Sequence, residues 1–171
     1  MQQINWFARK FDFSFKQNFF PCIIDRLAGT IIRLDHKIQQ IPRGELTKKM
    51  DETWSIQENI GHLIDLEPLW QGRLRDMLNG LEFMREADLQ NTHTHQAKHN
   101  EADVDDLLAS FATLRKQTLK SLGILNEKEI YQSSLHPRLK SPMRVMDLFL
   151  FVAEHDDHHL ARISELHRSF S

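Results

Sequence analysis

Apolar residues recur at steps of three and four along four separate stretches of this chain, and that period constrains its fold more than any other feature. In the first stretch, from Cys22 to Ile41, they share one helical face: Ile24, Leu27, Ile31, Leu34, Ile38 and Ile41. A period near 3.6 residues predicts an amphipathic α-helix that buries this face. Pro42 and Gly44 follow directly and are expected to end the helix.

The second stretch begins with a helix start signal at Ser55. The Ser-Ile-Gln-Glu segment places the Ser55 hydroxyl and the Glu58 carboxylate where each accepts from the other's free backbone amide. Pro68 lies inside the stripe and lacks the amide that would bond the carbonyl of Ile64, so it predicts a kink. We expect one kinked helix that ends near Gly80.

Two further stretches predict the third and fourth helices. The third carries its stripe from Val104 to Leu122, and Gly123 is expected to end it. The fourth begins at Ser141-Pro142, because serine caps helices and proline at the first helical position loses no bonded amide. It runs nearly to the C-terminus.

The connections between these helices differ in length. Residues 81–102 are mostly polar and form a longer link than compact bundles use between antiparallel neighbours, which predicts a crossover, a lid, or both. Residues 126–140 are expected to form a loop. The pattern as a whole predicts an all-α four-helix bundle with a long crossover between helices 2 and 3.

The size and composition of the chain fit one helical domain. A length of 171 residues matches a single ordinary domain, and only six Gly and five Pro interrupt it. We therefore predict one bundle domain over residues 1–171. Residues 1–20 hold six Phe and are expected to form an N-terminal extension that packs on the bundle.

Charge and cysteine content argue against several classes of protein. Lys and Arg number 22 against 24 Asp and Glu, so no excess of positive charge indicates nucleic acid as a partner. Charged residues interrupt the N-terminal apolar stretch, which argues against a signal peptide or membrane span. Cys22 is the only cysteine, which excludes an intramolecular disulfide and favours a cytoplasmic location.

Three histidines form the strongest candidate for chemistry. His155 and His159 lie one turn apart on the core-facing side of the last helix, and buried imidazoles are costly unless their nitrogens find partners. One metal ion bound by both would satisfy them, although two bonded neutral histidines are an alternative. His62 lies at the edge of the apolar stripe of the second helix. If these helices are neighbours, the three imidazoles could bind one divalent ion and leave it positions for water or substrate.

Other histidines are weaker candidates. His158 lies away from the core stripe and is assigned to the rim of the site. His93, His95 and His99 have a spacing that also permits metal binding, but a solvated, mobile connection is the expected setting. The long crossover that carries them could still fold over the opening of the site.

Two remaining side chains have competing interpretations. Asp156 lies on the core side of the last helix and could accept the spare proton of a ligand imidazole, which makes it a candidate supporting residue. An interhelical salt bridge or helix cap is an equal alternative. Cys22 has no histidine near it in sequence, so a buried structural thiol is expected rather than a nucleophile.

The segments W-S-I-Q-E-N-I-G-H-L-I-D-L-E at 54–67 and A-E-H-D-D-H-H-L-A-R-I at 153–163 resemble the DinB/YfiT-like family, and the resemblance extends from Leu27 onward. It implies an up-up-down-down four-helix bundle. It also implies a divalent metal ion, commonly zinc or nickel, held by His62, His155 and His159.

Three hypotheses about activity are weighed, of which the resemblance implies the first two. The first is a thiol S-transferase that joins a low-molecular-weight thiol, such as bacillithiol or mycothiol, to an electrophile. The second is a metal-dependent hydrolase, in which metal-bound water attacks an amide or ester. The third is a non-catalytic bundle that binds a ligand or partner in a stress response. A small-molecule substrate and a monomer or homodimer are expected in the enzymatic cases.

Overall fold

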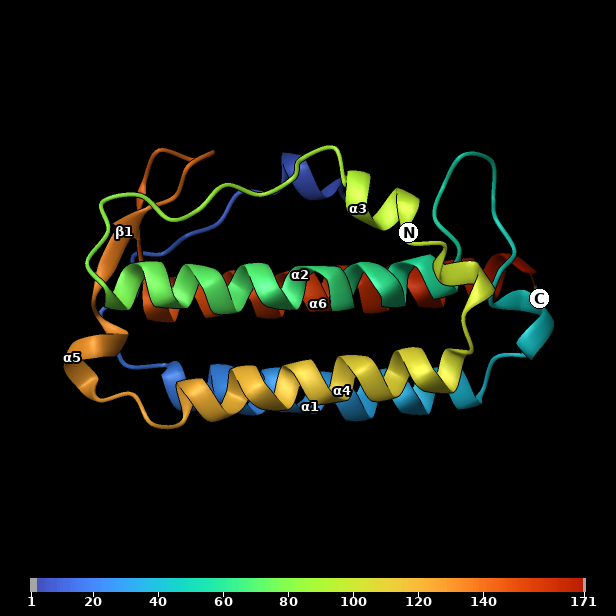
Figure 1. Cartoon of the computed structure of the whole chain (residues 1–171), viewed down its shortest axis with the longest axis horizontal. Helices are drawn as coiled ribbons and strands as arrows, with labels where there is room; N and C mark the ends of the chain where they lie inside the picture. Colours follow the sequence, from blue (N-terminus) through green and yellow to red (C-terminus); the bar gives the residue numbers. More distant parts are fainter. Residues whose placement is uncertain (1–2, 171) are drawn as a thin grey trace.

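Four long helices form the framework of the protein in this computed structural model, which describes residues 3–170. They are α1 (Phe20–Gln39), α2 (Ile56–Leu78), α4 (Val104–Leu122) and α6 (Val145–Phe170), and they confirm the predicted four-helix bundle (Figure 1). The capping box at Ser55 is present, and Pro68 lies within the continuous helix α2. Residues 1, 2 and 171 of the predicted domain lie outside the described residues.

Short elements occupy the connections. They are η1 (Trp6–Ala8), η2 (Arg43–Glu45), α3 (Thr92–Gln96), η3 (His99–Glu101), α5 (Glu127–Ile130), β1 (Ser133–Leu135) and β2 (Pro142–Arg144). The predicted loop at 126–140 therefore contains a helix and a strand, and β1 pairs antiparallel with β2.

The predicted start of the last helix at Ser141-Pro142 is wrong. Pro142 begins β2, and a proline is tolerated at the start of a strand. The helix begins at Val145, because the Asp147 carboxylate accepts the Arg144 amide at 2.9 Å and so binds backbone just before the first turn.

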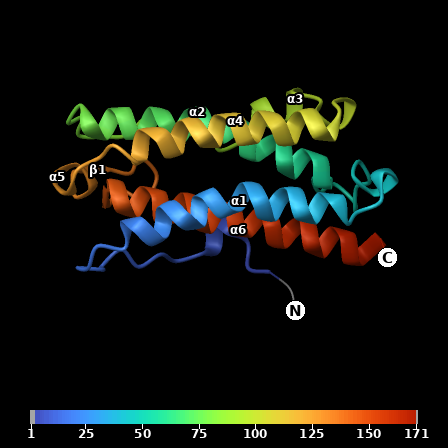
Figure 2. The ribbon, with the colours of Figure 1, turned by 90° about the horizontal axis from the view of Figure 1, so that it is seen from below.

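Contacts along the helices set their directions. Helices α1 and α6 are parallel, since Arg26 Nε donates to Asp157 at 3.0 Å and, further along both, Lys37 donates to Ser164 at 2.6 Å. Helices α2 and α4 are also parallel: Glu67 pairs with Arg115, and a turn later Gln71 donates to Thr118. Figure 2 shows these two pairs as separate layers.

Helices α2 and α6 are antiparallel, since Asn59 contacts His159 and Trp70 contacts Phe151. The order of directions is therefore up, down, down, up, and the up-up-down-down order that the resemblance implied is wrong. The chain reverses after α1 because Leu46 is buried at that end and its carbonyl accepts the Gln57 amide at 2.9 Å. The long crossover then returns along the bundle, so α4 starts at the same end as α2 (Figure 1).

A buried ion-pair network joins all four helices. Arg115 of α4 lies between Glu67 of α2, at 2.6 Å, and Asp156 of α6, whose Oδ1 accepts from Nη2 at 3.0 Å. Thr30 of α1 donates to Asp156 at 2.8 Å. A buried arginine needs such fully bonded partners, so the network fixes how the helices face one another.

Two segments outside the bundle lie on the side formed by α2 and α6 (Figure 1). One is the crossover. The other is the N-terminal segment, whose Trp6 and Phe11 rings each lie 5.0 Å from the ring of Phe151. No helix among the described residues is long and apolar enough to span a membrane.

Candidate metal centre

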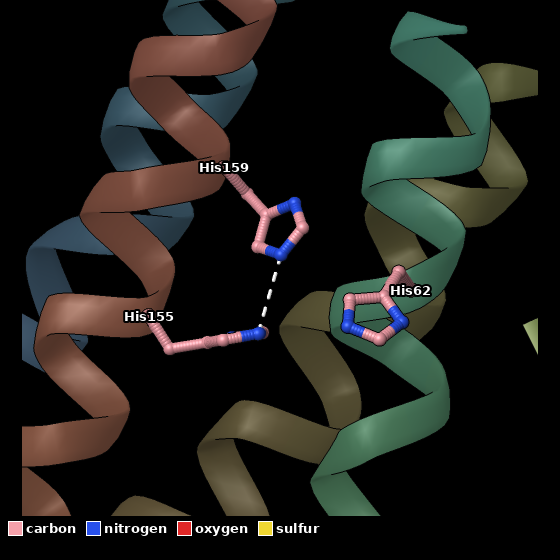
Figure 3. A group of neighbouring side chains, drawn as sticks. All are labelled: His62, His155 and His159. Atoms are coloured by element: carbon pink, nitrogen blue, oxygen red, sulfur yellow. Dashed lines mark hydrogen bonds between the residues drawn. The ribbon is translucent and has the colours of Figure 1, made fainter. Parts of the chain in front are cut away.

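The three predicted histidines meet between α2 and α6. One ring nitrogen from each of His62, His155 and His159 lies within 4.8 Å of the others, an arrangement that could hold a metal ion. The Nε2 atoms of His155 and His159 are 3.2 Å apart. Figure 3 shows the imidazoles directed toward one shared point, and each residue is no more than 6% exposed.

Helix α2 orients the ring of His159 through Asn59. The Asn59 Nδ2 donates to the Ser55 carbonyl at 2.7 Å, so its Oδ1 faces Nδ1 of His159 at 2.8 Å. An amide oxygen only accepts, which places the imidazole proton on Nδ1. Nε2 of His159 therefore carries a lone pair, which is directed into the cluster and lies 3.2 Å from Nε2 of His155.

The crossover orients His62 in the same way. Thr94 Oγ1 donates its proton to Asp65 Oδ2 at 2.8 Å and lies 3.1 Å from His62 Nδ1. A hydroxyl has one proton to donate, so Thr94 accepts from Nδ1–H of His62. Nε2 of His62 then carries no proton, and its lone pair can bind a metal ion. His99 Nε2 lies 2.9 Å from the same Asp65 oxygen. This chain from an imidazole to a carboxylate is typical of metal-ligating histidines.

Gly61 lets the crossover approach α2 closely. A Cβ at this position would lie 2.1 Å from Cγ of His99, well inside the contact distance of two carbons. Gln57 of α2 binds the same part of the crossover, since its Nε2 donates to the carbonyls of His99 at 2.7 Å and Ala102 at 2.6 Å. The glycine before His62 is thus needed for packing of the crossover.

The electrostatic setting keeps the cluster neutral. Burial lowers the pKa of His62 to about 4, and burial lowers the pKa values of His155 and His159 well below the ordinary value. Their neighbouring imidazoles lower these values further. Neutral imidazoles have the free lone pairs that metal binding requires.

The geometry of the cluster fits a bound ion. Two imidazole nitrogens on one tetrahedral zinc ion stand about 3.3 Å apart, close to the 3.2 Å between His155 and His159. Nδ1 of His155 is buried with no hydrogen-bond partner among residues 3–170, so no protein group holds this ring by its other nitrogen.

Aromatic rings enclose the cluster within a cavity of about 630 Å³. Trp54 lies 4.6 Å from the His62 ring, and Trp6 and Trp70 lie 4.9 and 5.9 Å from the His155 ring. The walls also include the crossover near residues 86–91 and the connection at 136–138. The walls of the cavity thus come from segments far apart in sequence.

The other predicted site residues are not part of the three-histidine cluster. Asp156 takes part in the ion pair with Arg115, which is the salt bridge kept as its alternative, and its hydrogen bonds go to Arg115 and Thr30. His158, which was expected at the rim, is half-buried and lines the same cavity. The expectation of a buried Cys22 is wrong: it lies in the first turn of α1, off the buried stripe, and is exposed.

The histidines of the crossover differ in burial. His93 and His95 are exposed, whereas His99 is buried; His93 and His99 both lie near Asp65, at 3.4 and 2.9 Å. Neither Asp65 nor Thr94 was predicted from the sequence to support the site. The spacing of three residues between His62 and Asp65 places both on one face of α2 and was a signal that they act together. Thr94, which links them, comes from the crossover, and its position depends on tertiary folding.

A helical bundle with a buried cluster of three histidines is the class that this fold and site define. Within that class, the chain belongs to the DinB superfamily, whose family model matches residues 26–163. The solved structure of YfiT from Bacillus subtilis, described as a probable metal-dependent hydrolase with an unusual four-helix bundle topology, superposes with a TM-score of 0.81 at 22% identity. The match covers 95% of this chain and 93% of YfiT. No curated protein matches the chain.

Proposed function

We propose that this chain is a metal-dependent enzyme whose His62, His155 and His159 bind one divalent ion, and that it transfers a low-molecular-weight thiol to an electrophile. The single observation that carries the proposal is the set of three buried, neutral imidazoles with their donor atoms within 4.8 Å. The description of the YfiT structure as metal-dependent supports the same use of this fold.

The donor set favours zinc or nickel over magnesium or calcium, because imidazole nitrogens suit the former and oxygen ligands the latter. A divalent ion held there would supply Lewis acidity, which lowers the pKa of a thiol or water that it binds. Asn59 and Thr94 would hold the ligand rings in place, and the tryptophans would limit access of bulk water.

The residues around the cluster favour a thiol as the nucleophile. Asp65 and Asp156, the carboxylates that flank the cluster on α2 and α6, are both engaged in hydrogen bonds. A thiol needs less help from a base than water does, since its ordinary pKa is about 8.5. Cys22 is exposed on α1 and outside the cavity lining, so the sulfur would come from a bound cosubstrate. Transfer forms a carbon–sulfur bond, expels the leaving group with its electron pair and releases the thiol proton.

Hydrolysis is the second candidate function. His158 lines the same cavity, and its buried Nδ1 has no hydrogen-bond partner among the described residues. Burial lowers the pKa of His158 to about 4, so its imidazole is neutral and would act as a weak base toward attacking water. A non-catalytic binding bundle is the remaining hypothesis.

Metal stoichiometry tests the proposal. We expect elemental analysis of purified, zinc-reconstituted protein to give about one ion per chain. His62→Ala should lose the ion, whereas His36→Ala, which removes an exposed histidine of α1, should keep it. Equal metal in both variants, or none in the unaltered protein, would contradict the three-histidine site.

Activity assays then separate the enzymatic hypotheses. Zinc-loaded protein would be incubated with a panel of small thiols and a haloalkyl electrophile, and in parallel with activated esters. Formation of a thioether that depends on His62 supports transfer. Ester hydrolysis with the same dependence, without thioether, would favour the hydrolase instead.

A further inference from the structure

The cavity that contains the histidine cluster has a second polar corner near Trp70. Three basic side chains line it: Arg73 of α2, and His136 and Arg138 from the connection between β1 and β2. Arg73 is 2% exposed and His136 is 3% exposed. Buried charge of one sign in a cavity wall calls for an explanation.

The guanidinium of Arg73 has no carboxylate partner. Its Nε donates to the Arg85 carbonyl at 3.1 Å, and Nη1 lies 3.2 Å from His136 Nε2. The acidic residue nearest on this helix, Asp76, is paired with the Arg85 side chain at 2.6 Å. Among residues 3–170, neither Arg73 nor Arg138 forms an ion pair within 4.0 Å. A buried cation without a paired carboxylate is costly, so a structural role alone explains it poorly.

The corner also has more hydrogen-bond donors than acceptors. His136 Nδ1 accepts the backbone amides of Arg138 and Leu139, each at 3.2 Å, so it carries no proton. The proton of a neutral imidazole is then on Nε2 and faces Arg73, whose guanidinium can only donate. His136 Nε2–H and the Arg73 guanidinium are thus two donors that face each other without an acceptor between them. An acceptor group bound beside them would satisfy both.

The charges of the three side chains act on one another. Burial, Arg73 and Arg138 lower the pKa of His136 to about 4, so this imidazole is neutral at pH 7. Burial lowers the pKa of Arg73 to about 10, with Asp76 opposing this shift and Arg138 adding to it, so Arg73 keeps its charge at neutral pH. The corner therefore holds two positive charges, which an anion would stabilise.

We propose that Arg73, His136 and Arg138 form a recognition subsite for a carboxylate of the molecule that binds in the cavity. A guanidinium offers a planar fork that matches the two oxygens of a carboxylate, and Nε2–H of His136 adds a third donor. Binding of a carboxylate at this subsite does not require the proposed function. Only the description of the bound molecule as a substrate rests on that function.

The distance between the two ends of the cavity defines the substrate class. The Arg73 guanidinium carbon lies 5.5 Å from the centre of the Trp70 ring, which lies 5.9 Å from the centre of the His155 ring, so this guanidinium and the His155 ring are at most about 11.4 Å apart. A small molecule can span that separation. The inferred substrate is a thiol or electrophile that carries a carboxylate several bonds from its reacting atom.

Binding of a matched pair of probes tests the subsite. Titration calorimetry at pH 7 would compare 4-phenylbutanoate with 4-phenylbutanamide, which differ only in the anionic group. We expect zinc-reconstituted protein to bind the carboxylate at least about tenfold more tightly than the amide. Arg138→Gln and Arg73→Gln should abolish this preference. Arg75→Gln, an exposed position on the same helix and outside the cavity lining, should retain it.

The design separates this proposal from the metal site. Repeating the titration in His62→Ala removes the proposed ion as a rival site for the carboxylate, and the preference should persist there. Equal binding of both probes to the unaltered protein would overturn the subsite, as would a preference that survives in Arg138→Gln. If Arg73→Gln fails to fold, the half-buried Arg138 alone decides the outcome.

Discussion

Replacing Gly61 by alanine tests whether the crossover supports the histidine cluster. The added Cβ would lie 2.1 Å from His99 Cγ, against an ordinary carbon contact of about 3.5 Å or more, so the ring must move by about 1.5 Å. Overpacking of this kind costs about 1–3 kcal/mol. The better helix propensity of alanine returns up to about 1 kcal/mol, and loss of the contact between His99 and Asp65 adds about 1 kcal/mol to the cost.

We therefore expect Gly61→Ala to lower the free energy of unfolding by about 2 kcal/mol, measured by urea titration of the metal-free protein. Gly29→Ala is the matched control, because nothing lies within 4 Å of its Cβ in helix α1. That variant should gain about 0.5–1 kcal/mol.

Two further measurements connect the packing to the site. The double variant with His99→Ala removes the ring that Gly61→Ala overlaps, so it should be more stable than the sum of the single changes predicts. Displacement of the crossover should also weaken zinc binding about 10- to 100-fold, because Thr94 moves away from His62. If Gly61→Ala is as stable as Gly29→Ala, the close approach of the crossover does not constrain position 61 and the reasoning fails.

Three other changes test separate parts of the structure. Thr94→Val removes the acceptor for Nδ1–H of His62 at nearly constant volume. Competition with a chelator should then show that zinc affinity falls about 10- to 100-fold. Unchanged affinity would mean that the hydroxyl is dispensable. Arg115→Met strands two buried carboxylates and should cost about 3–5 kcal/mol in urea unfolding, whereas the exposed Arg43→Gln should cost under about 1 kcal/mol. The three clustered imidazoles have pKa values below the unfolded value of about 6.5, so the unfolded state takes up their protons first as the pH falls. Metal-free protein should keep this stability above pH 6.5 and lose it toward pH 4, and a flat urea midpoint between pH 7 and 5 would contradict the neutral cluster.

The helices could be predicted because their signals are local. The stripe on α1 and the capping box at Ser55 act within a few residues, and both appear in the structure. The positions of His155 and His159 on the inner face of α6 follow from the same periodicity. Local geometry thus determined most of the framework and two of the three clustered imidazoles.

Features that depend on partners distant in sequence could not be predicted. Periodicity does not encode helix direction, which here depends on how the connections pack at the ends of the bundle. The pairing of β1 with β2 displaced the start of α6, because strand contacts compete with the helix signal of Pro142. Asp156 pairs with Arg115 rather than with a ligand imidazole, because a buried guanidinium needs carboxylates on both sides.

The three tryptophans of the chain all contact the histidine cluster. Intrinsic fluorescence excited at the indole band therefore reports almost entirely on this one region of the molecule. A quenching ion such as nickel should lower the fluorescence of all three tryptophans when it binds. Its binding can therefore be titrated without a label. For the same reason, fluorescence followed during unfolding would record the opening of the cavity, and circular dichroism would be needed to record the loss of the helices.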